Sequence, residues 1–374
     1  RDDAVLATWT PYPGANVTGL GIVLVTLPTA VGMSFTISSP VFTRVGNGAS
    51  HAPFNIPTIG YLSVVVHYSN GNSVSFTSPS YDDSLQFTIL DSGGSDIYLV
   101  DEEVYISDNA TIGHSFSIQA SFPGVYNDLS AIVSAHIIGL QDISLDTYSY
   151  PACSFQGSSA KSSKNEIYQI GCSGIYQRLA CIVRGTLTDG STKDVTSYST
   201  ITSNVTDVAG FTSQSVLTGV SAGGSYIQAL YQSMYSDSLR IRVHSSSVNL
   251  TSISLSPSSL STISGTIESS TQLSVYTEFS DDTCYLDAAS GSSLSWILAS
   301  QLVGFSSDMS DVLSVGGEGL MILHSNYYTT VKISASDVCE VTSPVTDEKP
   351  YYANLLPLPY DADMGLTVGA PFGI

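Results

Sequence analysis

One short pattern occurs three times in this chain of 374 residues: an apolar run of strand type that ends in a turn dipeptide. The copies cover residues 62–73, 179–190 and 273–282, and their turns contain Asn-Gly, Asp-Gly and Asp-Asp. These residue types tolerate the positive φ of a tight hairpin. The copies lie roughly 100 residues apart, whereas solenoid repeats are about 20–50 residues long. The pattern therefore predicts a series of separate domains.

Two further elements recur after each hairpin, in the same order. The first is a short strand, found at residues 96–100, 207–211 and 311–315. The second is an alternating strand, found at residues 115–120, 225–229 and 330–335. Alternation with a period of two residues places one face of a strand in a core and the other in water. Opening strands at residues 140–145 and 250–257 follow directly on the preceding repeat, which predicts that linkers are nearly absent.

Closely spaced turn signals and the lack of a helical period indicate an all-β fold of tandem immunoglobulin-like β-sandwiches. We predict a long N-terminal repeat over residues 1–138, two shorter repeats over 139–247 and 248–343, and a Pro-rich strip over 344–374. The strip holds no complete repeat. We therefore expect it to lead into, or to pack on, a further repeat.

Three short sequences in the middle and third repeats resemble those of a known family of domains. The middle repeat reads LTDGSTKDVTS at 187–197 and VLTGVSAG at 216–223, and the third repeat has ISLSP at 253–257. These sequences resemble the bacterial Ig-like group 2 family, whose modules act as rigid spacers in surface proteins and adhesins. Asp282 departs from that family's pattern, in which Gly is usual, and puts the strand order of the third repeat in question. Residues 353–372 are similar to segments of very large Ig-repeat surface proteins of algae, including mastigoneme shaft proteins.

Charge and hydropathy restrict the possible partners. The formal net charge of −21 would repel a phosphate backbone, so we expect no nucleic-acid partner. The longest apolar run, residues 19–28, is about half of the roughly 20 residues that a membrane-spanning helix needs, so we expect a buried strand there and no membrane span in this segment. The chain begins with Arg1 and has no signal-peptide pattern, which suggests that a leader has been removed or lies upstream.

Covalent modification is expected at two kinds of residue. Asn-x-Ser/Thr sequons would accept glycans in a eukaryotic secretory route; they lie at Asn16, Asn109, Asn204 and Asn249. The five cysteines include no Cys-x-x-Cys pair, which favours disulfides over a zinc site.

Two disulfides within repeats are expected from the cysteine positions. Cys284 follows the third hairpin and Cys339 ends the last strand predicted for that repeat, so we expect a bridge between them. Cys153 and Cys172 flank a Ser- and Lys-rich insertion that a second bridge would close. Cys181 lies on a strand as a buried free thiol, or alternatively pairs with Cys153.

Three sets of residues are candidates for reactive or metal sites, and none has the full pattern that such a site needs. Residues 219–223 fit the Gly-x-Ser-x-Gly nucleophile elbow, but an elbow needs a helix after Ser221, and the following residues alternate like a strand. The histidines lie singly, without metal-ligand spacing: His51, His67, His114, His136, His244 and His324. Asp361 and Asp363 match the first half of a calcium loop, which would also need a third carboxylate and a bidentate Glu. We predict no catalytic residue, no metal and no cofactor.

The expected function is that of a non-enzymatic spacer or shaft segment of an extracellular surface or filament glycoprotein. Its partners would be neighbouring repeats or copies of the same protein. Two alternatives are an adhesin or glycan-binding Ig-like region and an accessory Ig-like portion of a secreted hydrolase. The 22 tyrosines are scattered along the sequence, and no local cluster of Tyr or Trp marks a sugar-binding surface.

Overall fold

Most of the chain is described by the computed structural model. The described residues are 4–12, 15–22, 27–77, 85–90, 96–100, 103–124, 126, 129–151, 163–256, 261–286, 297, 299–340 and 342–356. The chain divides into two compact units, residues 1–142 with 185–193 and residues 143–184 with 194–374. Within the described ranges, no helix has the length and apolar character needed to cross a bilayer.

An antiparallel hairpin precedes the first sandwich. It consists of β1 (Ala4–Tyr12) and β2 (Ala15–Ile22), for which the backbone alone is described. The candidate glycan acceptor Asn16 and the apolar residues 19–22 lie on β2. The roles of Asn16 and of residues 19–22 stay predictions, because no side chain of this hairpin is described. The predicted buried strand over residues 19–28 is wrong at its end, because Leu27 is 76% exposed and residues 27–28 lie outside any strand.

The first sandwich consists of two sheets that share one core. One sheet has the order β3-β5-β9-β8, with β6 paired to β5: β3 (Ala30–Ile37), β5 (Ile59–Tyr68), β6 (Ser73–Thr77), β8 (Ile97–Val100) and β9 (Glu103–Ile106). The other has the order β4-β11-β10-β7: β4 (Val41–Phe42), β7 (Gln86–Ile89), β10 (Ser115–Ser121) and β11 (Ser130–Ile137). These are the orders A-B-E-D and A′-G-F-C of an immunoglobulin sandwich, with A′ parallel to G.

The second sandwich repeats this topology. Its A-B-E-D sheet, with β15 paired to strand B, contains β12 (Leu140–Tyr150), β14 (Arg178–Leu187), β15 (Thr192–Asp194), β17 (Ala209–Ser213) and β18 (Val216–Gly219). Its A′-G-F-C sheet, with β20 paired to strand F, contains β13 (Glu166–Ile170), β16 (Thr200–Ser203), β19 (Gly223–Tyr231), β20 (Met234–Tyr235) and β21 (Leu239–Val248). Again A′ runs parallel to G.

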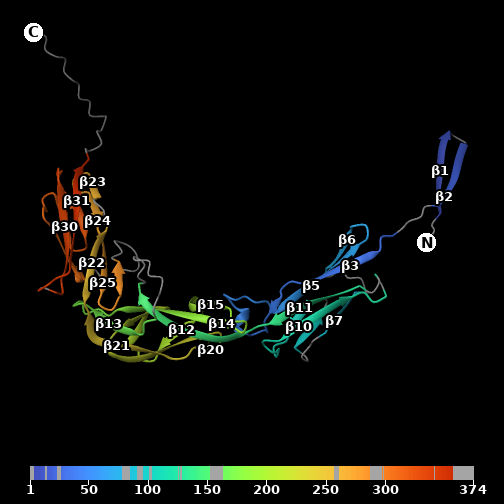
Figure 1. Ribbon diagram of the computed structural model, residues 1–374, viewed down its shortest axis with the longest axis horizontal. Coiled ribbons are helices and arrows are strands. Elements are labelled where there is room, and N and C mark those ends of the chain that lie inside the picture. Colours follow the sequence, from blue (N-terminus) through green and yellow to red (C-terminus); the bar gives the residue numbers. More distant parts are fainter. Residues whose placement is uncertain are drawn as a thin grey trace, which may run out of the picture. The chain divides into compact units, whose positions relative to one another are not determined.

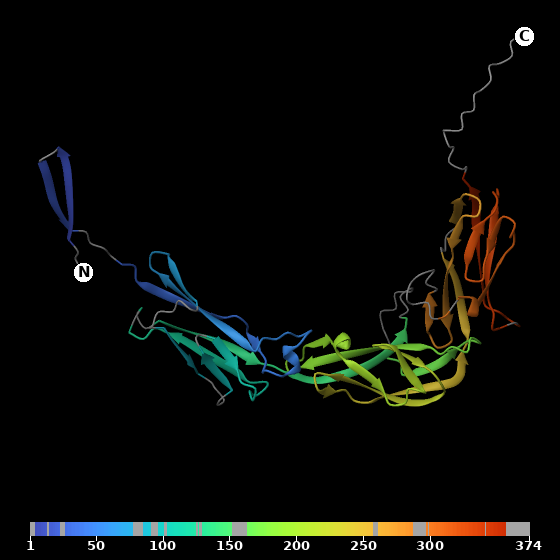
Figure 2. The ribbon, with the colours of Figure 1, turned by 180° about the vertical axis from the view of Figure 1, so that it is seen from behind.

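The third sandwich differs at strand B, which is split at Leu273 into β24 and β25. One short sheet contains β22 (Leu250–Ser256), β25 (Ser274–Phe279) and β26 (Cys284–Leu286), and the other contains β24 (Ser270–Gln272), β28 (Leu313–Val315) and β29 (Leu320–Leu323). The A′-G-F-C sheet contains β23 (Ser261–Gly265), β27 (Val303–Ser307), β30 (Thr330–Asp337) and β31 (Thr346–Leu355). Figure 1 shows β30 and β31 in red beside β22, β24 and β25 in gold to orange, and Figure 2 shows the same layers from behind.

Strand β31 corrects the predicted C-terminal boundary. It pairs with β30 over seven residues and with β23 over residues 351–355, so it is strand G of the third sandwich. The expectation that the strip 344–374 packs on a further repeat is therefore wrong for residues 346–355, whose backbone groups complete the sheet. The calcium candidates Asp361 and Asp363 lie outside the described residues.

The predicted hairpins are confirmed, including the one that departs from the family pattern. Gly71 and Gly190 have φ of 83°, and Asp282 takes the equivalent position with φ of 61°. Asp is one of the residues that visits this left-handed region. The strand order of the third sandwich is accordingly the same as in the other two, although Asp282 replaces Gly there.

The alternating strands predicted from the sequence lie in the sheets as F strands. In β10 the inward residues are Phe116, Ile118 and Ala120, each at most 1% exposed. Burying a side chain as large as Phe or Ile stabilises a fold by about 1.5–3 kcal/mol. The alternation therefore decides which face of each strand packs inward.

Candidate functional site

A pair of hydrogen bonds holds the residue just before strand A in every sandwich. In the first, the N–H of Ser69 donates to the carbonyl of Thr29 over 2.8 Å, and the N–H of Thr29 donates to Ser69 Oγ over 3.1 Å. In the second, Thr188 and Gly139 make the same two bonds, at 3.0 and 3.2 Å. We call these pairs the strand-A clamps.

The third clamp joins Ser280 and Asn249, at 2.9 and 3.2 Å. In all three repeats the hydroxyl residue directly precedes the turn dipeptide that follows strand B, and we call this turn in the B–C connection the B–C turn. A net contribution of about 0.5–1.5 kcal/mol per hydrogen bond is typical, so two bonds fix the direction in which the chain enters each sandwich.

Short connections accompany the clamps. Strand β11 ends at Ile137 and β12 begins at Leu140, and β21 ends at Val248 and β22 begins at Leu250. The prediction that linkers are nearly absent is confirmed. Asn249 is the single residue between the second and third sandwiches, and it is clamped on both its N–H and its carbonyl.

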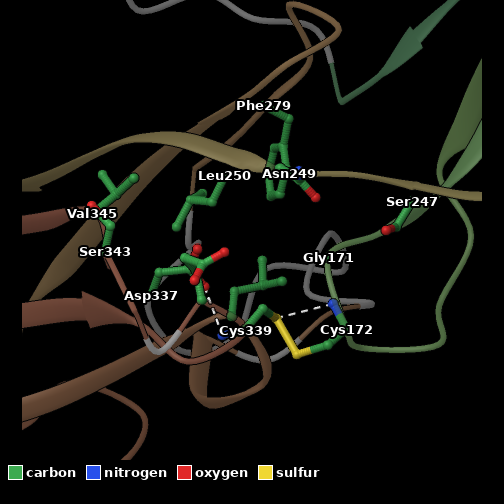
Figure 3. Close-up of a pocket in the computed structure, with 12 residues that line it drawn as sticks. Gly171, Cys172, Ser247, Asn249, Leu250, Phe279, Asp337, Cys339, Ser343 and Val345 are labelled. Atoms are coloured by element: carbon green, nitrogen blue, oxygen red, sulfur yellow. Dashed lines mark hydrogen bonds between the residues drawn. A yellow bond between two sulfur atoms is a disulfide. The ribbon is translucent and has the colours of Figure 1, made fainter.

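A disulfide joins the second sandwich to the third. Cys172 follows strand A′ of the second sandwich, Cys339 follows strand F of the third, and their Cα atoms lie 5.4 Å apart across a sequence separation of 167 residues. Figure 3 shows the bridge beside Gly171. A Cβ on Gly171, which has φ of +50°, would lie 3.0 Å from Cys339 Sγ. Glycine at this position therefore lets the two loops approach.

Both expected cysteine pairings are wrong. Cys339 bonds to Cys172 and not to Cys284, so neither the bridge within the third repeat nor the bridge across the insertion forms. Cys284 is disulfide-bonded with a different partner, and Cys153 lies outside the described residues. Cys181 is a buried free thiol, as one of the two alternatives expected, and burial raises its pKa to about 12.

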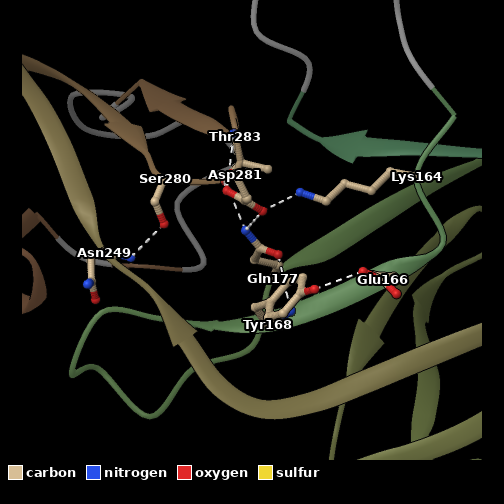
Figure 4. A network of polar contacts seen from close by, with 8 residues as sticks. All are labelled: Lys164, Glu166, Tyr168, Gln177, Asn249, Ser280, Asp281 and Thr283. Carbon is tan, nitrogen blue, oxygen red and sulfur yellow. Dashed lines mark hydrogen bonds and ion pairs between the residues drawn. The ribbon is translucent and has the colours of Figure 1, made fainter.

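A polar network crosses the same junction (Figure 4). Gln177, which is 1% exposed, donates from Nε2 to Asp281 Oδ2 and to Thr283 Oγ1, both at 2.9 Å. Its Oε1 accepts from the N–H of Tyr168 at 3.1 Å. Lys164 forms an ion pair with the same Asp281 carboxylate. The B–C turn of the third sandwich is thus bound to Lys164 and Gln177 of the second sandwich.

The network controls the ionisation of Asp281. Burial alone would raise the pKa of this carboxyl group, but the hydrogen bonds it accepts, of which that from Lys164 is the strongest, outweigh burial and hold the pKa below its ordinary value. Lys164 and Asp281 are only 18% and 17% exposed in their side chains. The pair is therefore shielded from solvent more than a surface salt bridge would be.

Apolar packing is also continuous across this junction. Ile170 and Val248, at the ends of strands A′ and G of the second sandwich, belong to the hydrophobic core of the third, together with Leu250 and Phe279. All four are at most 8% exposed. Separating the two sandwiches would expose these side chains to water, which opposes bending at Asn249.

A cavity of about 350 Å³ lies against the disulfide. Its lining mixes apolar Leu250 and Phe279 with polar side chains, among them Asn249 and Asp337 (Figure 3). The Asp337 carboxylate accepts the N–H of Cys339 at 2.8 Å, so it fixes the F–G loop that carries the bridge. No group of three or more His, Cys, Asp or Glu residues that could hold a metal occurs within the described ranges.

The start of the second sandwich has a different set of supporting contacts. Asn47 Oδ1, in the loop after strand A′ of the first sandwich, accepts the N–H of Leu140 at 2.9 Å. Lys193 donates to the carbonyl of Pro53 at 3.1 Å, and its ammonium group lies 5.7 Å from the centre of the Phe54 ring. An added Cβ on Gly185 would come within 3.0 Å of that same ring.

Three of the four sequons can be located with their side chains. Asn109, Asn204 and Asn249 are exposed. Asn204 Oδ1 accepts the N–H of Tyr226 at 2.8 Å and the hydroxyl of Ser225 at 3.0 Å. Exposure is compatible with the predicted glycans, which stay predictions.

The Gly-x-Ser-x-Gly sequence does not have the surroundings of a nucleophile elbow. Ser221 lies between β18 and β19, so a strand follows it where an elbow requires a helix. Its hydroxyl donates to the carbonyl of Asp207 at 2.6 Å. This is a turn contact.

Only some of the contacts between the second and third sandwiches could be anticipated from the sequence. The hydroxyl of each strand-A clamp is visible in the aligned repeats as Ser69, Thr188 and Ser280, directly before the turn dipeptide. Gln177 carries no comparable signal, because a single Gln before a strand is common and its partners lie 104 and 106 residues away.

No protein-family model and no curated protein matches the sequence. Solved structures that align with the chain include the surface-layer protein SbsC, domains 1–6 (TM-score 0.25, 12% identity, 92% of this chain and 42% of that chain). A second is invasin, a bacterial integrin-binding protein (TM-score 0.27, 10% identity, 94% of this chain and 65% of that chain). A third is protocadherin gamma B2, extracellular cadherin domains 1–5 (TM-score 0.21, 13% identity, 92% of this chain and 64% of that chain). The chain spans less than two thirds of each. At these TM-scores the alignments establish no relationship, and the immunoglobulin-like fold follows from the strand order.

Proposed function

We propose that this chain is a structural segment of an extracellular protein in which immunoglobulin-like sandwiches are joined in series with little freedom to bend. The observation that carries the proposal is the Cys172–Cys339 bridge, which crosses the one-residue linker Asn249. A linker of Gly and Ser would behave as a flexible coil. Here a covalent bond, a polar network and a shared apolar core join the two sandwiches on either side of the single connecting residue Asn249.

An extracellular or other oxidising location accounts for the disulfide, because cytosolic thiols are kept reduced. The exposed sequons at Asn109, Asn204 and Asn249 support a glycoprotein. We place the repeats at residues 27–138, 139–248 and 249–356, following the strands of each sandwich.

The proposed class is a spacer of the bacterial Ig-like group 2 kind within a large surface or filament protein, of which algal mastigoneme shafts are an example. The resemblance at residues 187–197 and 216–223 supports this assignment. The partners would be neighbouring repeats or further copies of the same protein. A spacer needs no catalytic residue, and Ser221 serves only as a turn residue here.

Small-angle X-ray scattering tests the proposal on the full chain. We expect the oxidised protein to give a narrow distribution of maximum dimensions, and the double variant Cys172→Ser/Cys339→Ser to give a broader one. Ser247→Ala is the matched control, because Ser247 is exposed and lines the same cavity but leaves the bridge intact. Scattering by the oxidised protein that fits freely jointed sandwiches at Asn249 would overturn the proposal.

A further inference from the structure

Two adjacent tyrosines and a third from a later strand meet on the third sandwich. Tyr327 and Tyr328 lie in the loop between β29 and β30, and Tyr352 lies on β31. They line a cavity of about 400 Å³ whose remaining lining residues are Thr262, Asn326, Ala353 and Asn354. Tyr327 and Tyr328 are neighbours in the sequence, and the pairing of β30 with β31 brings Tyr352 close to them.

The loop that carries two of these tyrosines is held in place on both sides. The N–H of Tyr327 donates to the carbonyl of Ala353 at 3.1 Å, and Asn326 Oδ1 accepts the N–H of Leu355. Tyr327 also packs against the hydrophobic core. The loop backbone and Tyr327 are therefore in place before any ligand arrives, which lowers the entropic cost of binding.

Aromatic surface remains uncovered at the mouth of this cavity. Tyr328 is fully exposed, at 100%, and Tyr352 is 39% exposed and directly opposite Thr262 in the strand register. A tyrosine offers an apolar ring and a hydroxyl that can donate and accept. The Thr262 hydroxyl and the Asn354 amide supply further hydrogen-bonding groups beside the rings.

Charge defines the class of ligand. None of the seven residues that line the cavity is charged, although the chain as a whole carries a net charge of −21. A concave surface of aromatic rings, amides and hydroxyls suits a neutral molecule that has apolar faces and many hydroxyl groups. We propose that this cavity binds neutral carbohydrate, with a sugar ring against Tyr328 and Tyr352.

A second pair of tyrosines, on the first sandwich, serves as a comparison for the proposed sugar site. Tyr98 and Tyr105 stack on each other, with ring centres 5.4 Å apart and an interplanar angle of 8°. The Tyr105 hydroxyl donates to the Glu103 carboxylate. There the rings cover each other beside a negative charge, whereas Tyr328 leaves both of its faces open to solvent.

Titration of the deglycosylated full chain with neutral oligosaccharides tests the proposal, with a polyuronate as the anionic comparison. Glucan, mannan, xylan and chitin fragments are the probes, and isothermal calorimetry or a glycan array is the readout. We expect saturable binding of at least one neutral probe and at least tenfold weaker binding by Tyr328→Ala. Tyr328→Phe should retain most of the affinity because the ring is kept.

The matched control is Tyr98→Ala, which removes an exposed tyrosine from another sandwich and should leave binding unchanged. Tyr328 is fully exposed, so its replacement leaves the fold intact. The proposal is overturned if no neutral probe binds at millimolar concentration, if Tyr328→Ala binds like the wild type, or if the polyuronate binds best. Scattering from the unliganded chain is independent of these outcomes, so the spacer function is tested separately.

Discussion

The second and third sandwiches begin with the same clamp but have different supporting contacts. Gly139 and Asn249 are each held by the hydroxyl residue of the following B–C turn. At the second sandwich the described support is an amide, Asn47, and a lysine over an aromatic ring, Lys193. At the third it is a disulfide and a largely buried ion pair.

This comparison separates the contacts that occur in every repeat, the clamps, from the contacts that occur only between the second and third sandwiches. The clamp uses three backbone groups and one hydroxyl, so it can be repeated wherever a Ser or Thr precedes the turn. The bridge and the pair between Lys164 and Asp281 need side chains from two sandwiches to meet, and they occur where a single residue connects the strands. We infer that the third sandwich is oriented more strictly than the clamp alone would require.

Removal of the disulfide should have the largest effect. We expect Cys172→Ser/Cys339→Ser to lower the free energy of unfolding of the joined second and third sandwiches by about 2–4 kcal/mol, toward the upper end because the closed loop is long. Urea denaturation followed by fluorescence measures the change. Ser247→Ala should stay within about 0.5 kcal/mol of the wild type. Equal stability of the double variant and the wild type would show that the bridge does not constrain this junction.

Loss of the Asp281 charge should have the next largest effect. Asp281→Asn leaves Lys164 shielded and without its ion-pair partner, and hydrogen bonds to charged groups contribute about 1.5–3 kcal/mol each. We expect a loss of about 2 kcal/mol in the same denaturation experiment. Asp189→Asn is the matched control at the equivalent turn of the second sandwich, where the exposed carboxylate bonds within its own turn to Ser191. A loss as large in the control would mean that turn geometry, and not the junction, is responsible.

Acid should reduce the difference between wild type and Asp281→Asn. A carboxyl group whose pKa is lowered by folding contributes its full stabilisation above its unfolded pKa, about 3.9, and loses it as pH falls through the folded pKa. The pKa of Asp281 is lowered, so the wild-type advantage should be constant near neutrality and shrink below about pH 4. Unfolding free energies of both proteins between pH 3 and 7 check this. A difference that stays constant to pH 3 would rule out ionised Asp281 as the source.

The clamps should give the smallest and most uniform effect. Ser280→Ala and Thr188→Val each remove one hydroxyl acceptor and leave an N–H without its partner, which costs about 1 kcal/mol. We expect the two losses in unfolding free energy to agree within about 0.5 kcal/mol. A loss at one sandwich and none at the other would mean that the clamp is not a shared device.

Residues that recur between repeats could be predicted, and those that occur once could not. Strands A, B, D and F and the B–C turn were predicted because their patterns repeat. Strand β31 was missed partly because Pro350 lies within it, and proline is excluded from the interior of a sheet. The strand register explains why Pro350 is tolerated in β31. β23 pairs with β31 only from Tyr351 onward, so Pro350 has a paired neighbour on one side only, Lys332 of β30. On the other side no strand pairs with Pro350, so its missing N–H costs no hydrogen bond there.

The sequence by itself determined the all-β class and the hairpins, because these depend on local φ preferences and on alternation over a few residues. The clamp hydroxyls recur in the sequence, but their partners lie 31 to 49 residues away. Tertiary structure alone decided that Cys172 bonds to Cys339 and that Gln177 reaches Asp281. Disulfide formation requires two Cα atoms to lie within about 7 Å. Sequence spacing does not predict that distance for residues on different sandwiches, because it is set by how the two sandwiches pack around Asn249.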